Sequence, residues 1–253
     1  MPKRIMSLCL FAILQFSAVL SHAVENSPNV IFDEGHGQLF SIDDTGDLKL
    51  SKLAETMRST GVRVSKTKDF LSNDTLNGAT ALVISGLFKP LQSDEVESII
   101  RFIQKGGRVA VMMHIAPPLS NLVFRLGLGL SKTVLHERQN VIDDDINFRV
   151  TDLSPNPLFT GIDSFSAYGV WAVDPREAAT AIARTSPDAW MDLNFDRILS
   201  EGDLVGAFAI VATGSLGTGK YVIFGDDAIF QNRFLVNNNQ ILAVNLTKWL
   251  TAP

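Results

Sequence analysis

Residues 29–38 read NVIFDEGHGQ, and here a short apolar run ends abruptly in polar side chains beside glycine. A run of this kind is typical of a buried strand in a parallel sheet. A second one, YVIFGDD, occupies residues 221–227 near the other end of the chain. In open α/β sheets, ligands bind just beyond the carboxyl ends of such strands. The sequence therefore indicates where a site lies before it indicates what the site does.

The first half of the chain alternates strand and helix patterns. Strands are predicted at residues 30–33, 62–64, 79–85 and 108–113. Between them, apolar residues recur at helical spacing over residues 50–57 and 96–103, and Ser93 is the expected N-cap of the second helix. Strands that alternate with helices predict a parallel sheet with right-handed crossovers.

The second half is predicted from weaker patterns. A helix is expected to begin at the two prolines 117–118, and residues 131–200 to form an irregular elaboration packed on one side of the sheet. Apolar runs at 204–213 and 220–225 flank a glycine-rich stretch, which predicts a C-terminal β-hairpin. A helix over residues 239–250 is expected to close the chain.

The first 23 residues have the pattern of a secretory signal peptide. Lys3 and Arg4 form a basic start, residues 5–20 are mostly apolar, and Ala23 ends a small-residue cleavage site. The alternative, an uncleaved membrane anchor, is disfavoured because the run is short for a span. We therefore expect residues 24–253 to form a single periplasmic or secreted α/β domain, with no later membrane span.

Composition argues against several classes of function. The single cysteine, Cys9, lies in the predicted signal peptide, so the exported protein would have no disulfide and no thiol nucleophile. The formal charge of −5 and the lack of a basic stripe argue against nucleic acid as a partner. Residues 214–221, GSLGTGKY, resemble a phosphate-binding loop, but Tyr221 stands where a Ser or Thr is required. We expect no cofactor.

Polar side chains at the predicted strand ends form the candidate ligand-binding site. Because parallel strands end at a common edge, we expect these groups to line one crevice. Its members are Asp33, Glu34, His36, Gln38, His114, Asp226 and Asn232. Two imidazoles among carboxylates could hold a divalent metal or act as acid and base, but no recognised metal-ligand spacing is present. We therefore assign no catalytic residue and no metal ligand. Asp33 as a turn cap and His36 as a surface residue are the structural alternatives.

Residues 30–38 and three further stretches resemble the DUF4350 and GldG-like domains of bacteria. The further stretches are GGRVAV at 106–111, NPLFTG at 156–161, and GKYVIFGD at 219–226 with the following Asn232 and the terminal helix. These domains are related to the N-terminal domain of intraflagellar transport proteins and belong to the class I glutamine amidotransferase-like superfamily. The resemblance implies a flavodoxin-like three-layer sandwich. It also implies that MMHI, at 112–115, replaces the segment of the catalytic cysteine.

Together these features predict an exported, non-catalytic binding or assembly module with an amidotransferase-like fold. The expected partners are an envelope or transporter protein, or a small polar ligand such as a sugar. The alternative is a metal-assisted or acid/base hydrolase that acts on a carbohydrate-like substrate, with His36 and His114 as ligands or as acid and base.

Overall fold

The computed structural model describes residues 27–176 and 179–253. The predicted signal peptide, residues 1–23, lies outside the described residues. Within the described part, none of the helices has both the length and the apolar character that a membrane crossing requires.

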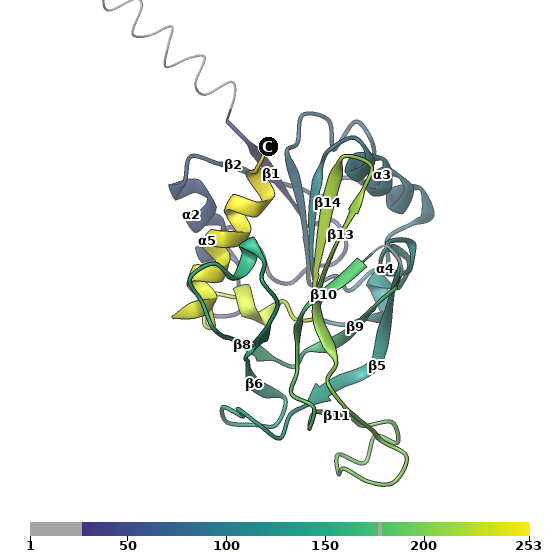
Figure 1. The fold of residues 1–253 in the computed structure, drawn as a ribbon. Helices are drawn as coiled ribbons and strands as arrows, with labels where there is room; N and C mark the ends of the chain where they lie inside the picture. Colours follow the sequence, from purple (N-terminus) through teal and green to yellow (C-terminus); the bar gives the residue numbers. More distant parts are fainter. Residues whose placement is uncertain (1–26, 177–178) are drawn as a thin grey trace, which may run out of the picture.

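An eight-stranded sheet in the order β2-β1-β3-β4-β14-β13-β10-β7 forms the middle of the molecule (Figure 1). Its strands are β1 (Asn29–Asp33), β2 (Arg63–Thr67), β3 (Ala81–Ser85), β4 (Arg108–Met112), β7 (Asp152–Leu153), β10 (Ala179–Arg184), β13 (Ala209–Leu216) and β14 (Gly219–Phe224). From β2 to β14 in this order, neighbouring strands are parallel. The pairs β14–β13, β13–β10 and β10–β7 are antiparallel. The parallel part has the strand order of flavodoxin-like sheets. The predicted α/β fold with a mostly parallel sheet is confirmed.

Strand β1 shows why helices cover both faces of the sheet. Its side chains alternate between faces, so that Val30 and Phe32 enter one hydrophobic core and Ile31 enters the other. The helices are α2 (Ser51–Ser59) and α5 (Asn238–Thr251) over the first core, and α3 (Ser93–Gln104) and α4 (Ser120–Arg125) over the second (Figure 1). The result is a three-layer sandwich.

The first turn of α3 differs from the prediction that Ser93 is its N-cap. The N-cap is Gln92, and Ser93 is the first helical residue. The Glu95 carboxylate accepts a hydrogen bond from the backbone N–H of Gln92 at 2.9 Å, which is one half of a capping box. Glu95 is only 1% exposed, and it takes part in the site described below.

The predicted C-terminal hairpin is formed by β13 and β14, with two differences in extent. Residues 204–213 are not one strand, because β12 (Leu204–Val205) belongs to a separate sheet. Most of the glycine-rich stretch is strand, and only Gly217 and Thr218 separate β13 from β14. Gly217 has a φ of 61°, a left-handed conformation that two-residue hairpin turns require.

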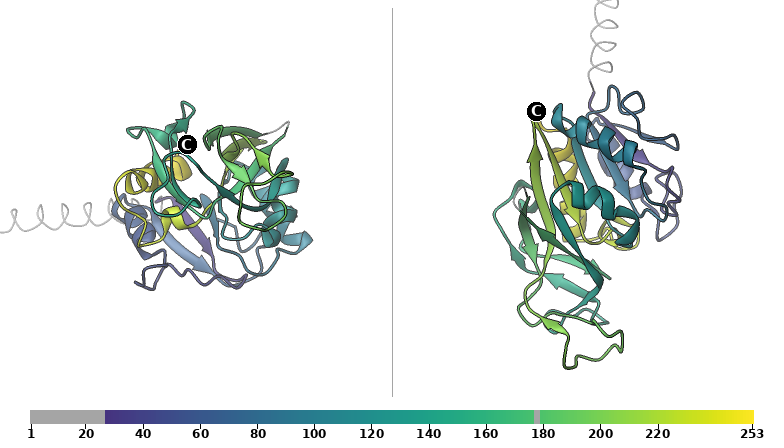
Figure 2. Two further views of the ribbon diagram at one scale, coloured as in Figure 1. Left: turned by 90° about the horizontal axis from the view of Figure 1, so that it is seen from below. Right: turned by 90° about the vertical axis from the view of Figure 1, so that its right-hand side faces the viewer.

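Residues 131–200 extend the large sheet as well as forming a smaller lobe (Figure 2). The prediction that the whole segment packs on one side of the sheet is therefore wrong, because β10 continues the sheet beyond β13. The lobe contains β5 (Leu128–His136), β6 (Asn147–Val150), β8 (Phe165–Tyr168), β9 (Trp171–Pro175) and β11 (Trp190–Met191). Short 3-10 turns occur elsewhere in the chain, at Pro117–Leu119, Pro157–Phe159 and Ala228–Phe230. The lobe is attached beyond the end of β14, where the backbone N–H of Trp171 donates to the Gly225 carbonyl at 2.7 Å.

Candidate functional site

The carboxyl ends of β1, β3, β4 and β14 meet at one edge of the sheet, and the polar residues there form two clusters. One is centred on His36 after β1, and the other on His114 after β4. Phe88 connects them. Its backbone N–H donates to the carbonyl of His36 at 3.1 Å, and its ring centroid lies 5.4 Å from that of His114.

The His36 cluster is a closed network of buried groups. Nδ1 of His36 lies 2.8 Å from an Asp33 carboxylate oxygen, and Nε2 lies 3.0 Å from a Glu95 carboxylate oxygen. Gln38 donates to Asp33 at 2.6 Å and accepts from the His36 backbone N–H at 2.6 Å. His36 is 8% exposed. Since both ring nitrogens have carboxylate partners, this imidazole has no free nitrogen for a metal or a substrate.

The charges of this cluster support one another. Burial by itself lowers the pKa of His36, but the hydrogen bonds and charges of Asp33 and Glu95 outweigh it and raise that pKa above its ordinary value. Burial raises the pKa of Glu95, yet backbone N–H donors from Gln92 and Leu71 and the nearby His36 lower it overall. The favoured species is an imidazolium between two carboxylates. This arrangement ties the loop after β1 to the first turn of α3.

Glu34 and Asn232, two further predicted site residues, hold loops in place instead. Glu34 accepts from the backbone N–H of Ile42 at 3.0 Å and forms an ion pair with Lys66 at 3.0 Å. Asn232 accepts from the backbone N–H of Lys52 at 2.9 Å, at the start of α2. Neither side chain hydrogen-bonds to an imidazole in the part of the chain that the structure describes.

The His114 cluster is open to solvent. Nδ1 of His114 lies 3.1 Å from an oxygen of Asp227, and the side chain is 39% exposed. The ring meets Phe40 edge-on at a centroid distance of 4.8 Å, and Phe88 lies beside it. The hydrogen bond to Asp227 raises the pKa of His114, against an opposing effect of burial. Among the described residues Nε2 has no hydrogen-bond partner, and it is not one of the buried unpaired atoms, so it is accessible to solvent.

Two buried oxygen atoms at this edge of the sheet lack hydrogen-bond partners among the described residues. They are Oγ of Ser85, at the end of β3, and Oδ2 of Asp227. Gly86 has a φ of 59°, and a Cβ at this position would lie 2.9 Å from Asp227 Oδ2 and 2.5 Å from the Phe40 ring. Glycine therefore lets the chain approach the carboxylate closely. Unsatisfied buried polar atoms are rare in native proteins, and here they gather at the predicted ligand edge.

The acidic residue that faces His114 is Asp227, not the predicted Asp226. The Asp226 carboxylate accepts from the backbone N–H groups of Tyr168 and Ala228, both at 2.7 Å. Burial, and then the neighbouring Asp227, raise the pKa of Asp226 well above its ordinary value. Burial also raises the pKa of Asp227, although His114 acts in the opposite direction. Asp226 thus anchors the lobe to the sheet, and Asp227 supports the imidazole.

Sequence reasoning did not select Glu95, Phe40, Phe88 or Asp227 for the site. Glu95 had a usable signal, because an acidic residue in the first turn of a helix is a capping-box position. The two phenylalanines follow β1 and β3 in loops of no regular pattern, so that no periodicity indicated their direction. Only their packing on His114 identifies them.

Among the cavities in the described residues, five have volumes of about 370 to 680 Å³, and His114 lines none of these five. In residues 27–176 and 179–253, no group of three or more His, Cys, Asp and Glu side chains is arranged to hold a metal ion. The arrangement can bind and donate hydrogen bonds through one imidazole, with aromatic rings at its side.

Residues 43–247 match the model of the domain of unknown function DUF4350. The chain belongs to this family. Among solved structures, the mmIFT52 N-terminal domain is similar with a TM-score of 0.71 at 17% identity, over 88% of this chain and 98% of that one. A ThuA-like protein from Bacteroides uniformis is similar with a TM-score of 0.57 at 14% identity, over 89% and 92%. No curated protein sequence matches the chain.

A cold-adapted β-galactosidase from Rahnella sp. R3 is also similar, with a TM-score of 0.52 at 16% identity. This chain is covered over 90% of its length and that enzyme over only 32%. At these identities the structural likenesses show the fold alone. The DUF4350 membership and the amidotransferase-like fold implied by the sequence are thereby confirmed, and the GldG-like relation stays a prediction.

Proposed function

We propose that this protein is an exported, non-catalytic binding module that takes a polar, hydroxyl-bearing small molecule of the carbohydrate class at the His114 edge. One observation carries the proposal. A half-exposed imidazole, held by a buried carboxylate, presents Nε2 to solvent between aromatic side chains. Ligand sites combine apolar surface with a few well-placed polar groups, which suits a molecule with both C–H faces and hydroxyls.

The surrounding groups support binding without chemistry. Glycoside hydrolysis ordinarily uses two carboxyl groups that reach the bond from either side. The three carboxylates nearest this edge, those of Asp33, Asp226 and Asp227, are buried. Here Asp227 is bonded to His114, Asp226 is bonded to backbone N–H groups, and Asp33 is bonded to His36. The stretch MMHI at residues 112–115 stands where the resemblance places the segment of the nucleophilic cysteine, and it contains no cysteine. The occurrence of this fold within a β-galactosidase chain is consistent with a carbohydrate ligand.

The runner-up is an acid/base hydrolase. A histidine oriented by a buried carboxylate is the arrangement of a general base, and His114 with Asp227 has it. Turnover of chromogenic glycosides or esters that disappears in Asp227→Asn would favour the hydrolase. Binding without turnover would favour the module.

A ligand panel with matched variants tests the proposal. Mono- and oligosaccharides are titrated into the protein while the backbone amide resonances of the loop after β4 are followed by NMR. We expect saturable shifts that are lost in His114→Gln and weakened in Phe88→Ala. Phe124→Ala is the control, because Phe124 is an exposed phenylalanine on α4. Absence of any saccharide-dependent shift, or shifts that survive both site variants, would refute the carbohydrate module.

Export and a protein partner are part of the same proposal. Export rests on the amino-terminal sequence, and the partner rests on the resemblance to domains that serve as binding or assembly modules. Fractionation of bacteria that express the full chain should place the processed protein outside the cytoplasm, with Val24 as the new first residue. Crosslinking in intact cells should then trap an envelope or transporter component. A protein retained in the cytoplasm at full length would contradict the export prediction and leave the ligand test unaffected.

A further inference from the structure

The largest of the five cavities, about 680 Å³, lies at the edge of the sheet where β4 and β14 begin, opposite the His114 edge. Strand starts, the end of α5 and the loop that contains Pro157 form its walls. Arg108, Lys220 and Lys248 contribute three cations to the lining, and among the described lining residues there is no Asp or Glu. This cavity is called the Arg108 cavity below.

Arg108 is a buried cation without an Asp or Glu partner among the described residues. It is 9% exposed, and its guanidinium donates one hydrogen bond, from Nη2 to an oxygen of Pro253, the last residue of the sequence, at 3.2 Å. The guanidinium also lies over the ring of Trp249, 5.3 Å from its centroid. No Asp or Glu side chain in the described part of the chain forms an ion pair with it. Buried charges are ordinarily paired, and burial lowers the pKa of this guanidinium.

Lys220 increases the imbalance, because it is the register partner of Arg108 on the neighbouring strand β14. Like charges side by side on adjacent strands destabilise a sheet. Lys248, in the last turn of α5, adds a third cation. The end of a helix carries roughly half a negative charge. Together with a terminal carboxylate at Pro253, it offsets only part of the three positive charges. A positive potential therefore remains in the cavity.

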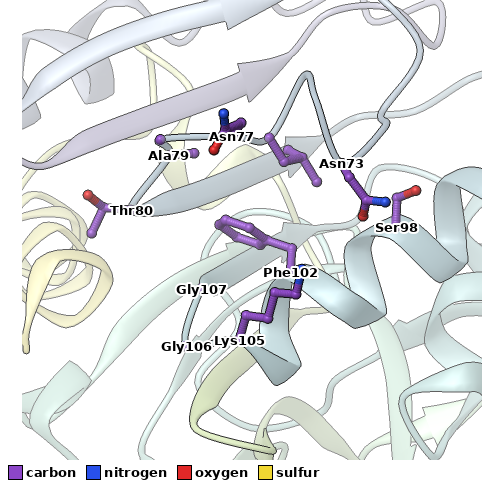
Figure 3. A pocket seen from close by; sticks show the side chains of 11 residues that line it. Asn73, Asn77, Ala79, Thr80, Ser98, Phe102, Lys105, Gly106 and Gly107 are labelled. Atoms are coloured by element: carbon purple, nitrogen blue, oxygen red, sulfur yellow. The ribbon is translucent and has the colours of Figure 1, made fainter.

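The neighbouring cavity at the same edge, about 370 Å³, has no comparable charge (Figure 3). Its lining includes Asn73, Phe102 and Lys105, and Lys105 is the only cation among the described lining residues. The concentration of positive charge is thus a property of the Arg108 cavity and not of this edge in general.

We propose that the Arg108 cavity binds a small organic anion through its carboxylate or phosphate group. The guanidinium of Arg108 and the ammonium of Lys220 contact the oxyanion, and the body of the ligand lies against Trp249. A guanidinium has several donors in one plane, which matches the oxygen atoms of either group. The aromatic wall adds apolar contact for an organic body. This site is independent of the function proposed for the His114 edge.

Isothermal titration of the whole protein with benzoate and with phenyl phosphate tests the proposal, at constant ionic strength set with sodium chloride. We expect saturable binding of at least one probe. Arg108→Gln should weaken it about tenfold or more, since a charge-assisted hydrogen bond is lost. Lys220→Gln, at an exposed position, should weaken it by a smaller factor. Lys132→Gln removes the same charge from the lobe and should leave binding unchanged.

The two probes distinguish the two anions. Saturation by phenyl phosphate alone assigns a phosphate ester, and saturation by benzoate alone assigns a carboxylate; both outcomes support an anion site. Because Arg108 is buried, its variant is compared at matched folded fraction, and Lys220→Gln provides a second test that does not disturb the core. Failure of both probes to saturate the native protein would overturn the proposal. So would affinities that neither variant changes.

Discussion

Replacing Glu95 by glutamine tests whether the His36 cluster stabilises the fold through charge. The substitution keeps the shape of the side chain and one acceptor oxygen. The carboxylate now accepts from the backbone N–H groups of Leu71 and Gln92, both at 2.9 Å, and faces His36 Nε2 at 3.0 Å. An amide places its –NH₂ against at least one of these donors. It also leaves the imidazolium with a single carboxylate partner, Asp33.

The expected loss is about 3 kcal/mol of unfolding free energy. A hydrogen bond to a charged group contributes roughly 1.5 to 3 kcal/mol, and breaking a buried ion pair costs about 3 to 5 kcal/mol. The lower part of that combined range applies, because Asp33 still pairs with His36. For a domain of this size, about 3 kcal/mol lowers the melting temperature by roughly 6 to 12 °C.

The pH dependence separates charge from packing. The folded pKa of His36 lies above its unfolded value, so its contribution is fully present below the unfolded pKa of about 6.5 and is lost as pH rises through the folded pKa. Urea unfolding followed by circular dichroism should therefore show a larger effect of Glu95→Gln near about pH 6 than near about pH 9.

Glu97→Gln on the same helix is the control. Glu97 pairs with Arg125, and both side chains are about half exposed. The expected loss of unfolding free energy for Glu97→Gln is therefore below about 0.5 kcal/mol. Equal losses for the two variants, or an effect of Glu95→Gln that is the same at both pH values, would refute the reasoning.

Three further variants address the His114 edge and the core. Gly86→Ala should destabilise the protein by more than about 2 kcal/mol in urea unfolding, because the φ of 59° disfavours alanine and the new methyl group meets Asp227; a stable Ala variant would show that the close approach is absent. Asp227→Asn should lower the pKa of His114 towards its ordinary value of about 6.5 in an NMR titration, since the carboxylate hydrogen bond raises it now; an unchanged titration would mean that the two side chains do not interact in solution. Tyr221→Phe should cost about 1 to 2 kcal/mol in thermal unfolding, because the hydroxyl donates to the buried carbonyl of Leu126 at 2.7 Å; no measurable loss would indicate that water replaces the donor.

Much of the fold could be predicted because local patterns and global topology agree. The apolar run before Asp33 and the helical spacing of Val96, Ile99 and Ile103 each indicate one element and one buried face. The lobe could not be predicted in the same way. Its strands are short, and β10 joins the large sheet through pairing with a strand about 30 residues away, which no local pattern reports.

For the candidate site, the sequence by itself determined that polar groups follow β1, β4 and β14, because a buried strand must end where charged side chains begin. It could not say which of these groups meet. Only the tertiary structure brings Glu95 from α3 against His36, and turns Asp227 rather than Asp226 towards His114. The physical reason is that a hydrogen bond depends on distances of about 3 Å between atoms far apart in the chain, and these are set by the packing of helices and loops on the sheet.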